Sequence, residues 1–453
     1  MKFWGITGTN GKTTTTWIFA EFLNATQASK QSDNPNSQTV RKCGYVTTVE
    51  VNTGSRRFYT GYTTPPLAQL KEIFAEMEAN GCTDCVMEVS SHAIHQHRTG
   101  DTVFSGGVFT NLSEDHLDYH KTMEAYFDVK LDFARQIAAA HKATPDMGRK
   151  DLPPYVVCLD GGYGTEMFNA VGNLAVNVIG VSAATARATS MASTASATSM
   201  ASTASATSMA SPSRTTGPRP NYDLSELQLV GDYNRSNVLC AAALAEAAGV
   251  PHDVIQKTIP TLKPRWGRLE EVKSKSEKVK ARVFVDFAHT PDGLEKVLSA
   301  VRKTMQGPTQ VFEYMSREEA QSNNRTIEQS NNSLWVVFGA GGDRDPMKRP
   351  LMGEACAKLA DKLVVTSDNP RSEDPLKIID AILVGVNRTI GESERSNNVF
   401  VEPDRRKAIE FALANAAEGD VVIIAGKGHE TTQEIKGVKY PFDDRETVRE
   451  YTK

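Results

Sequence analysis

The residues best suited to chemistry near the start of the chain form a glycine-rich turn, followed by a lysine and a row of threonines. Residues 5–16 read Gly-Ile-Thr-Gly-Thr-Asn-Gly-Lys-Thr-Thr-Thr-Thr, directly after an apolar stub. Backbone N–H groups of such a turn point at an anion, and the lysine adds a mobile positive charge. The hydroxyl after the lysine can contact Mg²⁺. An ordinary turn before a helix is the alternative, but the pattern favours a phosphate-binding loop made of Gly8, Thr9, Asn10, Gly11, Lys12, Thr13 and Thr14.

Further candidate side chains follow two apolar segments. Glu88 closes the run Cys-Val-Met-Glu, and an acid at a strand end beside a phosphate loop commonly holds Mg²⁺. A helix cap or a surface acid is the alternative. Residues 111–120 read Asn-Leu-Ser-Glu-Asp-His-Leu-Asp-Tyr-His, which is typical of a metal or substrate shell but also of a solvated loop.

Lys130 lies among apolar residues of an expected helix. A lysine there is costly unless it is paired or modified. The commoner explanation is a side chain that extends along the surface and keeps its ammonium in water.

The elements that must position these residues alternate between apolar strands and helices, which predicts an α/β fold with mainly parallel sheets. In the first half, strands are expected at 2–7, 85–89, 103–110, 155–159 and 177–181, and helices at 12–24, 67–80, 123–140 and from about 234. A doubly wound, Rossmann-like unit is expected to follow, with strands at 281–287, 334–339, 362–366, 399–401 and 420–425. These patterns divide the chain into a P-loop-type domain at 1–271 and a C-terminal domain at 272–453.

Polar residues follow the strands of the second domain where each strand ends. Because ligands bind at the carboxyl ends of the strands in a doubly wound sheet, this coincidence indicates a binding site. The residues concerned are Asp286 with His289, and the segments 341–344, 368–371 and 427–430.

Composition limits the functional classes. The chain has 453 residues and a net charge of −4, so nothing suggests a nucleic acid as partner. Neither a signal peptide nor a membrane-spanning segment is evident. The six cysteines are scattered, which fits a reducing cytoplasm, and Cys82 and Cys85 are expected to be small buried hydrophobes rather than a redox pair. Two polar segments are expected to be surface insertions: an Ala/Ser/Thr/Met repeat at about 183–216, which should be disordered, and 315–333.

The motifs, taken in order, resemble the Mur ligases of peptidoglycan synthesis. They are similar in particular to the members that add the third residue of the stem peptide. The match covers essentially the whole chain apart from the insertions. The segments that carry it are 7–14, 62–65, 88–92, 111–120, 231–237, 267–270, 286–292, 341–345, 367–371 and 426–430.

The resemblance implies ATP and Mg²⁺ as cofactors and a role for each matched residue. The catalytic residues would be Lys12, Glu88, His116 and Lys130, and the magnesium ligands Thr13, Glu88, His116 and Lys130, the last as a carbamate. Besides the phosphate loop, the nucleotide would be contacted by Asn234, Asn237, Arg268 and Asp286. The muramoyl peptide would contact Thr63, Thr64, Ser90, Gln96 and Arg98. The incoming amino acid would contact Arg344, Asp368, Asn369, Pro370, Arg371, Gly426 and Glu430.

Arg371 bears on which amino acid is added. Family members that add meso-diaminopimelate have Asp-Asn-Pro-Arg at this place, as here at 368–371. A guanidinium can bind the second carboxylate of diaminopimelate in a bidentate manner, whereas lysine offers only an ammonium. The resemblance thus implies a cytoplasmic, ATP-dependent ligase that joins diaminopimelate to the UDP-muramoyl dipeptide through an acyl phosphate.

Two alternatives stay open at this point: a ligase similar to folylpolyglutamate synthetases, and a degenerate nucleotide-binding protein without catalysis. One departure from the family is also evident. Family members carry an N-terminal domain for the uridine diphosphate, and this sequence begins at the first strand of the ATP-binding domain. The sequence is a fragment, or a separate N-terminal domain is supplied elsewhere, or the nucleotide end is not recognised.

Overall fold

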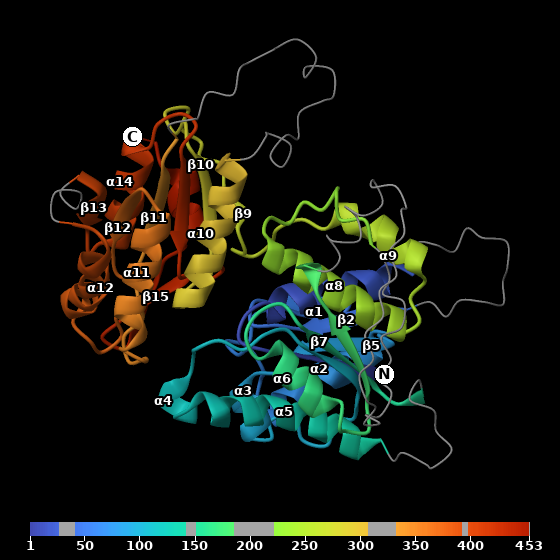
Figure 1. Cartoon of the computed structure of the whole chain (residues 1–453). Helices are drawn as coiled ribbons and strands as arrows, with labels where there is room; N and C mark the ends of the chain where they lie inside the picture. Colours follow the sequence, from blue (N-terminus) through green and yellow to red (C-terminus); the bar gives the residue numbers. More distant parts are fainter. Residues whose placement is uncertain (27–40, 142–150, 185–221, 307–331, 392–396, 453) are drawn as a thin grey trace, which may run out of the picture. The chain divides into compact units, whose positions relative to one another are not determined.

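The computed structural model describes residues 1–26, 41–141, 151–184, 222–306, 332–391 and 397–452 (Figure 1). Almost all of the expected insertion at 183–216, and of the one at 315–333, lies outside these residues. The chain forms two compact units. Unit 1 comprises Met1–Ser113, Thr122–Leu227 and Asp232–Leu262, and unit 2 comprises Glu114–Lys121, Gln228–Gly231 and Lys263–Lys453.

Unit 1 is built on a sheet whose described strands run in the order β4-β3-β2-β5-β1-β6-β7-β8. Neighbours from β2 to β8 are parallel, and the edge strands β3 and β4 are antiparallel. The strands are β1 Lys2–Thr7, β2 Cys43–Val46, β3 Val51–Asn52, β4 Arg57–Phe58, β5 Asp84–Glu88, β6 Phe104–Phe109, β7 Pro154–Cys158 and β8 Asn177–Val181. The helices are α1 Lys12–Ala25, α2 Leu67–Ala79, α3 Ser91–His95, α5 Met123–Ala140, α6 Gly164–Val171, α8 Asp232–Ala247 and α9 His252–Thr258, followed by the 3₁₀ turn Ile259–Thr261.

Unit 2 holds a second sheet in the order β13-β12-β11-β14-β10-β9, parallel except for β9. Its strands are β9 Glu270–Glu271, β10 Arg282–Asp286, β11 Leu334–Phe338, β12 Lys362–Val365, β13 Val399–Val401 and β14 Val421–Ala425, and a separate hairpin pairs β15 Thr432–Ile435 with β16 Val438–Pro441. The helices are α4 Leu117–His120, α10 Pro291–Gln306, α11 Lys348–Leu359, α12 Pro375–Thr389, α14 Arg405–Asn415 and α15 Asp444–Glu450. The expected α/β class, with mainly parallel sheets, is confirmed.

The sequence explains why these elements form. The strand β14 is apolar throughout, β5 is apolar between Asp84 and Glu88, and both strands are fully buried, as expected for parallel strands covered on both faces. Some of the helices begin after a side chain that accepts a backbone N–H, such as Thr122 before α5 and Asp374 before α12. In both sheets a tryptophan donates to a buried aspartate: Trp4 to Asp84 over 2.9 Å and Trp335 to Asp420 over 3.0 Å.

The order of the central strands positions the candidate site of unit 1. Because β5, β1 and β6 are parallel neighbours, the residues that follow them meet at one edge of the sheet. These are Glu88 at the end of β5, the glycine-rich turn after β1, and Thr110 after β6.

The cysteines and the helices also bear on the expectations from composition. Cys82 and Cys85 are buried and not bonded to each other, which confirms the expectation of small buried hydrophobes. Among the described residues, no helix has the length and apolar character needed to cross a membrane.

Candidate active site

The glycine-rich turn lies between β1 and α1, and two of its glycines are required by close contacts. Gly11 has a φ of 82° and precedes the first turn of α1, which holds Lys12, Thr13 and Thr14. A Cβ on Gly11 would lie 2.4 Å from Asn237 Oδ1, and one on Gly8 would lie 2.0 Å from Thr110 Oγ1. The backbone of the turn therefore approaches its neighbours more closely than any side chain would permit.

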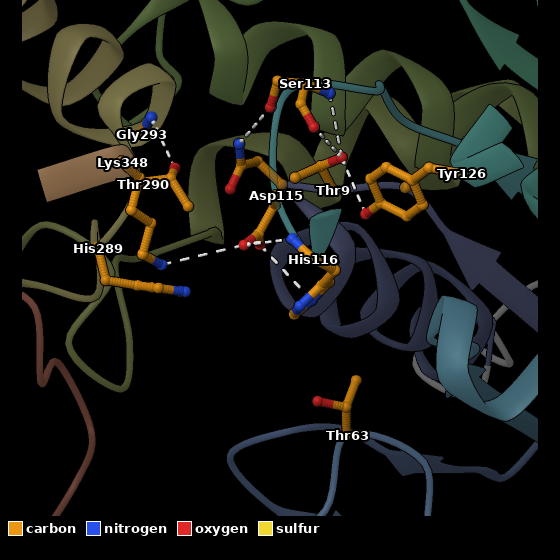
Figure 2. A network of polar contacts seen from close by, with 12 residues as sticks. Thr9, Thr63, Ser113, Asp115, His116, Tyr126, His289, Thr290, Gly293 and Lys348 are labelled. Atoms are coloured by element: carbon orange, nitrogen blue, oxygen red, sulfur yellow. Dashed lines mark hydrogen bonds and ion pairs between the residues drawn. The ribbon is translucent and has the colours of Figure 1, made fainter. Parts of the chain in front are cut away.

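Asn111 holds the turn in place. Its Oδ1 accepts the backbone N–H of Asn10 over 2.9 Å, and its Nδ2 donates to the Asn10 carbonyl over 3.0 Å. Thr9 is fixed beside it: Thr9 Oγ1 accepts the N–H of Ser113 over 3.1 Å and lies 3.2 Å from the Tyr126 hydroxyl (Figure 2). The segment 111–113 thus preorganises the turn.

Lys12 and the two asparagines of α8 lie around the same turn. Lys12 Nζ donates to the carbonyl oxygens of Gly8 and Thr9 over 3.0 and 2.7 Å. Asn237 Oδ1 accepts from Thr15 Oγ1 of α1 over 3.3 Å, and Asn237 Nδ2 donates to Asn234 Oδ1 over 3.3 Å. The structure therefore brings the expected phosphate loop together with both asparagines expected to contact the nucleotide.

Lys130 is buried, with an exposed fraction of 1%. Its Nζ donates to Thr7 Oγ1 over 3.1 Å and to the Gly8 carbonyl over 3.0 Å. The alternative that Lys130 extends along the surface and keeps its ammonium in water is therefore wrong. The ammonium is directed at the start of the phosphate loop, where a modification would place any added group next to that loop.

The Glu88 carboxylate is fully buried at the end of β5. Oε1 accepts the backbone N–H of Thr48 over 2.8 Å, and Oε2 accepts the Thr48 hydroxyl over 2.9 Å. Thr48 Oγ1 lies 3.1 Å from Thr63 Oγ1. The alternatives of a helix cap and of a surface acid are both wrong, and Thr48 is a residue that the sequence did not single out.

The residues expected to contact the muramoyl peptide form one hydrogen-bonded group beside Glu88. Thr64 Oγ1 donates to the Glu88 carbonyl over 2.9 Å and accepts the N–H of Ser90 over 3.0 Å. Arg98 donates to the Thr64 carbonyl over 3.3 Å and, through two nitrogens, to Gln96 Oε1. Thr63, Thr64, Ser90, Gln96 and Arg98 thus come together although they span 36 positions of sequence.

His116 belongs to unit 2, unlike Glu88 and Lys130. It has a φ of 56° before α4, its backbone N–H donates to Asp115 Oδ1 over 3.0 Å, and its ring Nε2 lies 3.5 Å from Asp115 Oδ2. Lys348 Nζ lies 4.0 Å from Asp115 (Figure 2). Within the described ranges, no group of three or more His, Cys, Asp or Glu side chains is placed to hold a metal ion, so the ligand set from the sequence stays a prediction.

Asp286 closes β10 in unit 2 and anchors the turn that contains Arg268. Its carboxylate accepts the N–H groups of Leu269 and Ala288 over 2.6 and 2.7 Å. Burial raises the pKa of this carboxyl, and the charge of Arg268 and the two N–H groups only partly oppose the effect. The Arg268 guanidinium lies over the Phe287 ring at 4.5 Å. The two residues expected to contact ribose and phosphates are therefore neighbours.

Three loops at the carboxyl ends of β11, β12 and β14 bring the expected amino-acid pocket together. Asn369 Nδ2 donates to Glu430 Oε2 over 2.9 Å. Gly342 donates through its N–H to the Asn369 carbonyl and accepts from Arg371 Nη1 over 2.6 Å. Arg344 is exposed on the same loop, its Cγ 3.7 Å from where a Cβ on Gly341 would lie. A Cβ on Gly342 would strike the carbonyl of Pro370 at 2.0 Å, so the two loops are in contact.

Two residues of this region were not among the predicted site residues. Lys427 is fully buried, and its Nζ donates to Asn369 Oδ1 over 3.1 Å and to Glu430 Oε2 over 2.9 Å. Glu434 of β15 donates its N–H to Asn369 Oδ1 over 2.9 Å, and its carboxylate lies 3.7 Å from Arg371 Nε. Lys427 lies within a motif that the sequence singled out, whereas nothing in the sequence marked Glu434.

Comparisons with known proteins agree with this arrangement. Residues 6–245 match the domain family described as "Mur ligase middle domain", and residues 316–428 match the one described as "Mur ligase, glutamate ligase domain". The chain is 35% identical to a UDP-N-acetylmuramoyl-L-alanyl-D-glutamate–2,6-diaminopimelate ligase of Aquifex aeolicus, over 98% of this chain and 76% of the relative. It is 36% identical to the ligase of the same name from Synechococcus elongatus, over 99% and 76%.

Solved structures give the same result. A structure of a UDP-N-acetylmuramoyl-L-alanyl-D-glutamate–2,6-diaminopimelate ligase has 28% identity and a TM-score of 0.51, covering 99% of this chain and 77% of that one. A Mycobacterium tuberculosis folylpolyglutamate synthase complexed with ADP has a TM-score of 0.55 over 94% of this chain and 87% of that one, but its 16% identity supports a shared fold alone.

The fold and the matched domains define an ATP-dependent enzyme that forms amide bonds. The chain belongs to the Mur ligase family.

Proposed function

We propose that this ligase joins meso-diaminopimelate to the D-glutamyl carboxylate of UDP-MurNAc-L-Ala-D-Glu, with hydrolysis of ATP to ADP and phosphate. The observation that carries the proposal is the position of Arg371. Its guanidinium is held by the Gly342 carbonyl and faces Glu434, in the same loop system as Asp368, Asn369 and Glu430. Cationic and anionic side chains in one pocket suit an amino acid with a carboxylate and an ammonium at its far end.

The residues around the phosphate loop fit ATP and Mg²⁺. Gly8 and Gly11 leave no room for a Cβ beside Thr110 and Asn237, and a glycine-rich turn before a helix presents backbone N–H groups that suit phosphates. Thr13 and Glu88 are buried and offer hydroxyl and carboxylate oxygens, which are the ligands that a hard cation prefers. We assign the metal to Thr13, Glu88, His116 and a carbamate on Lys130. When bound, Mg²⁺ neutralises negative charge on the transferred phosphoryl group.

The proposed reaction has two steps. The D-glutamyl carboxylate attacks the γ-phosphorus of ATP, so that an acyl phosphate forms and ADP leaves. Lys12 stabilises the charge on the phosphates during this transfer. The amine of diaminopimelate then attacks the acyl carbon, a proton is lost from the nitrogen, and phosphate departs as the amide forms. Asn234, Asn237, Arg268 and Asp286 would hold the nucleotide, and Thr63, Thr64, Ser90, Gln96 and Arg98 the muramoyl peptide.

Phosphate release from ATP tests the proposal. The purified protein, Mg²⁺, ATP and the UDP-muramoyl dipeptide are mixed with meso-diaminopimelate or with lysine. We expect release that depends on diaminopimelate and is much slower with lysine. Faster release with lysine than with diaminopimelate would show that the proposal is wrong. So would faster release when a folate replaces the dipeptide and glutamate replaces diaminopimelate. Because the relatives extend beyond the matched region, which covers 76% of their length, the assay is repeated at high dipeptide concentration.

A further inference from the structure

The side chain of Arg405 is fully buried beneath the carboxyl ends of β12 and β14. Its Nε and Nη2 donate to the two oxygens of Asp444, each over 2.8 Å. Asp444 is also fully buried, at the start of α15. The pair is thus bidentate, and the guanidinium cannot turn without losing two charge-assisted hydrogen bonds.

The remaining donors of Arg405 reach the two strand ends. Nη2 donates to the Ala425 carbonyl over 2.9 Å, and Nη1 donates to the Ser367 carbonyl over 3.4 Å. Ala425 directly precedes Gly426, and Ser367 directly precedes Asp368. Both following residues belong to the proposed amino-acid pocket, so one side chain ties together the two loops that carry them.

Asp368 offers an acceptor at this point. Its exposed fraction is 8%, and its Oδ2 accepts no hydrogen bond within the part of the chain that the structure describes. A Cβ added to Gly426 would lie 2.5 Å from this oxygen and 3.9 Å from Arg405 Nη2. Asp368 Oδ2, Gly426 and the Arg405 guanidinium therefore lie close together. A buried carboxylate oxygen that accepts no hydrogen bond is suited to bind an ammonium group.

The charges couple the pair to the pocket. Burial opposes the charged form of Arg405, but the carboxylates of Asp444, Asp368 and Glu430 outweigh it, so that the pKa of the guanidinium is raised. A buried ion pair need not add stability, since well-packed apolar residues often replace one without loss.

We propose that Arg405, held by Asp444, is a positioning residue for the amino-acid pocket. It fixes the ends of β12 and β14 so that Asp368 Oδ2 and the backbone at Gly426 face an ammonium group of the incoming amino acid. The identity of that amino acid rests on the proposed function; the positioning itself does not.

The double variant Arg405→Met/Asp444→Leu tests the proposal, because it removes both charges and leaves neither partner buried alone. A matched control is Arg282→Met/Glu271→Leu, a bidentate pair at the amino end of β10. For the first variant we expect a Tm close to that of the wild type, a KM for diaminopimelate raised about tenfold or more, and an unchanged KM for ATP. Amide hydrogen exchange should rise at 366–371 and 424–430. The control should change none of these.

A folded variant with unchanged exchange at both segments and an unchanged KM for diaminopimelate would overturn the proposal. If the double variant does not fold, the same KM and exchange measurements are made on Asp444→Asn. Asparagine has the shape of aspartate but holds the guanidinium less tightly, so the same outcomes support or overturn the proposal. A wild-type protein that does not use diaminopimelate would end the proposed function. The exchange comparison, which needs no substrate, would still decide the role of Arg405.

Discussion

Lys130 Nζ donates a hydrogen bond of 3.0 Å to the carbonyl oxygen of Gly8, so a lysine in α5 is tied to the first glycine of the phosphate loop. A buried ammonium needs such partners. The same position would let a carbamate on Lys130 present its oxygens beside the loop.

The first prediction concerns this lysine. Lys130→Ala should lower kcat about a hundredfold or more, because the proposed carbamate ligand is lost. Small carboxylates such as acetate or formate should restore part of the activity. Phosphate release measured with and without these acids tests the prediction. A variant that folds, with reduced activity that no carboxylate restores, would mean that Lys130 supports the loop only as an ammonium.

The second prediction concerns Arg371. Arg371→Ala should raise the KM for diaminopimelate about thirtyfold and leave the KM for ATP unchanged, since a charge-assisted contact of about 2 kcal/mol is lost on the amino-acid side alone. Arg388→Ala is the matched control, because Arg388 is exposed on α12, where its guanidinium lies 3.5 Å from the Glu354 carboxylate. Equal changes in both KM values for the Arg371 variant would contradict the assignment.

The third prediction concerns Gly11. Gly11→Ala places a methyl group 2.4 Å from Asn237 Oδ1 at a φ of 82°, so the loop must shift and ATP binding should weaken at least about tenfold. Gly81→Ala is the control, because Gly81 has a φ of 75° but no atom within 4 Å of the added Cβ. It should lose about 1 kcal/mol of stability and keep its affinity for ATP. Binding of a fluorescent ATP analogue to both variants distinguishes the two effects.

The fourth prediction concerns pH. Burial, followed by the charges of Arg268 and Arg445, lowers the pKa of His429 to about 3. Between this folded-state pKa and the ordinary histidine pKa of about 6.5, the imidazole binds a proton in the unfolded chain but not in the folded chain. The free energy of unfolding should therefore fall as the pH falls through this window, by up to about 1.4 kcal/mol per pH unit from this group.

Urea unfolding of the wild type and of His429→Phe at several pH values from 7 to 5 tests this slope. The phenylalanine keeps the ring packed near Phe287 and cannot titrate, so the slope should decrease. A slope that is the same in the wild type and His429→Phe would contradict the prediction.

Much of the site could be predicted because its residues follow strands that are apolar enough to be found in the sequence. The expected strands 2–7, 177–181 and 399–401 and the helix 123–140 have the observed bounds. The short strands β2, β3 and β4 and the hairpin β15–β16 were not predicted, since segments of two to four residues are too short to give a periodic signal.

The partners of the site residues could not be predicted for a different reason. Thr48 contacts Glu88 across 40 positions, and Arg405 contacts Asp444 across 39. Such pairs depend on which strands become neighbours. Glu88 could be singled out because it closes an apolar strand, whereas no local pattern in the sequence distinguishes Thr48 or Arg405.

The most direct test of the account follows an oxygen atom. The UDP-muramoyl dipeptide is labelled with ¹⁸O in the D-glutamyl α- and γ-carboxylates and incubated with the protein, ATP, Mg²⁺ and meso-diaminopimelate. If the carboxylate attacks the γ-phosphate, the muramoyl tripeptide forms and the released phosphate carries ¹⁸O from the dipeptide. Unlabelled phosphate, or labelled dipeptide recovered without coupled product, would contradict the account.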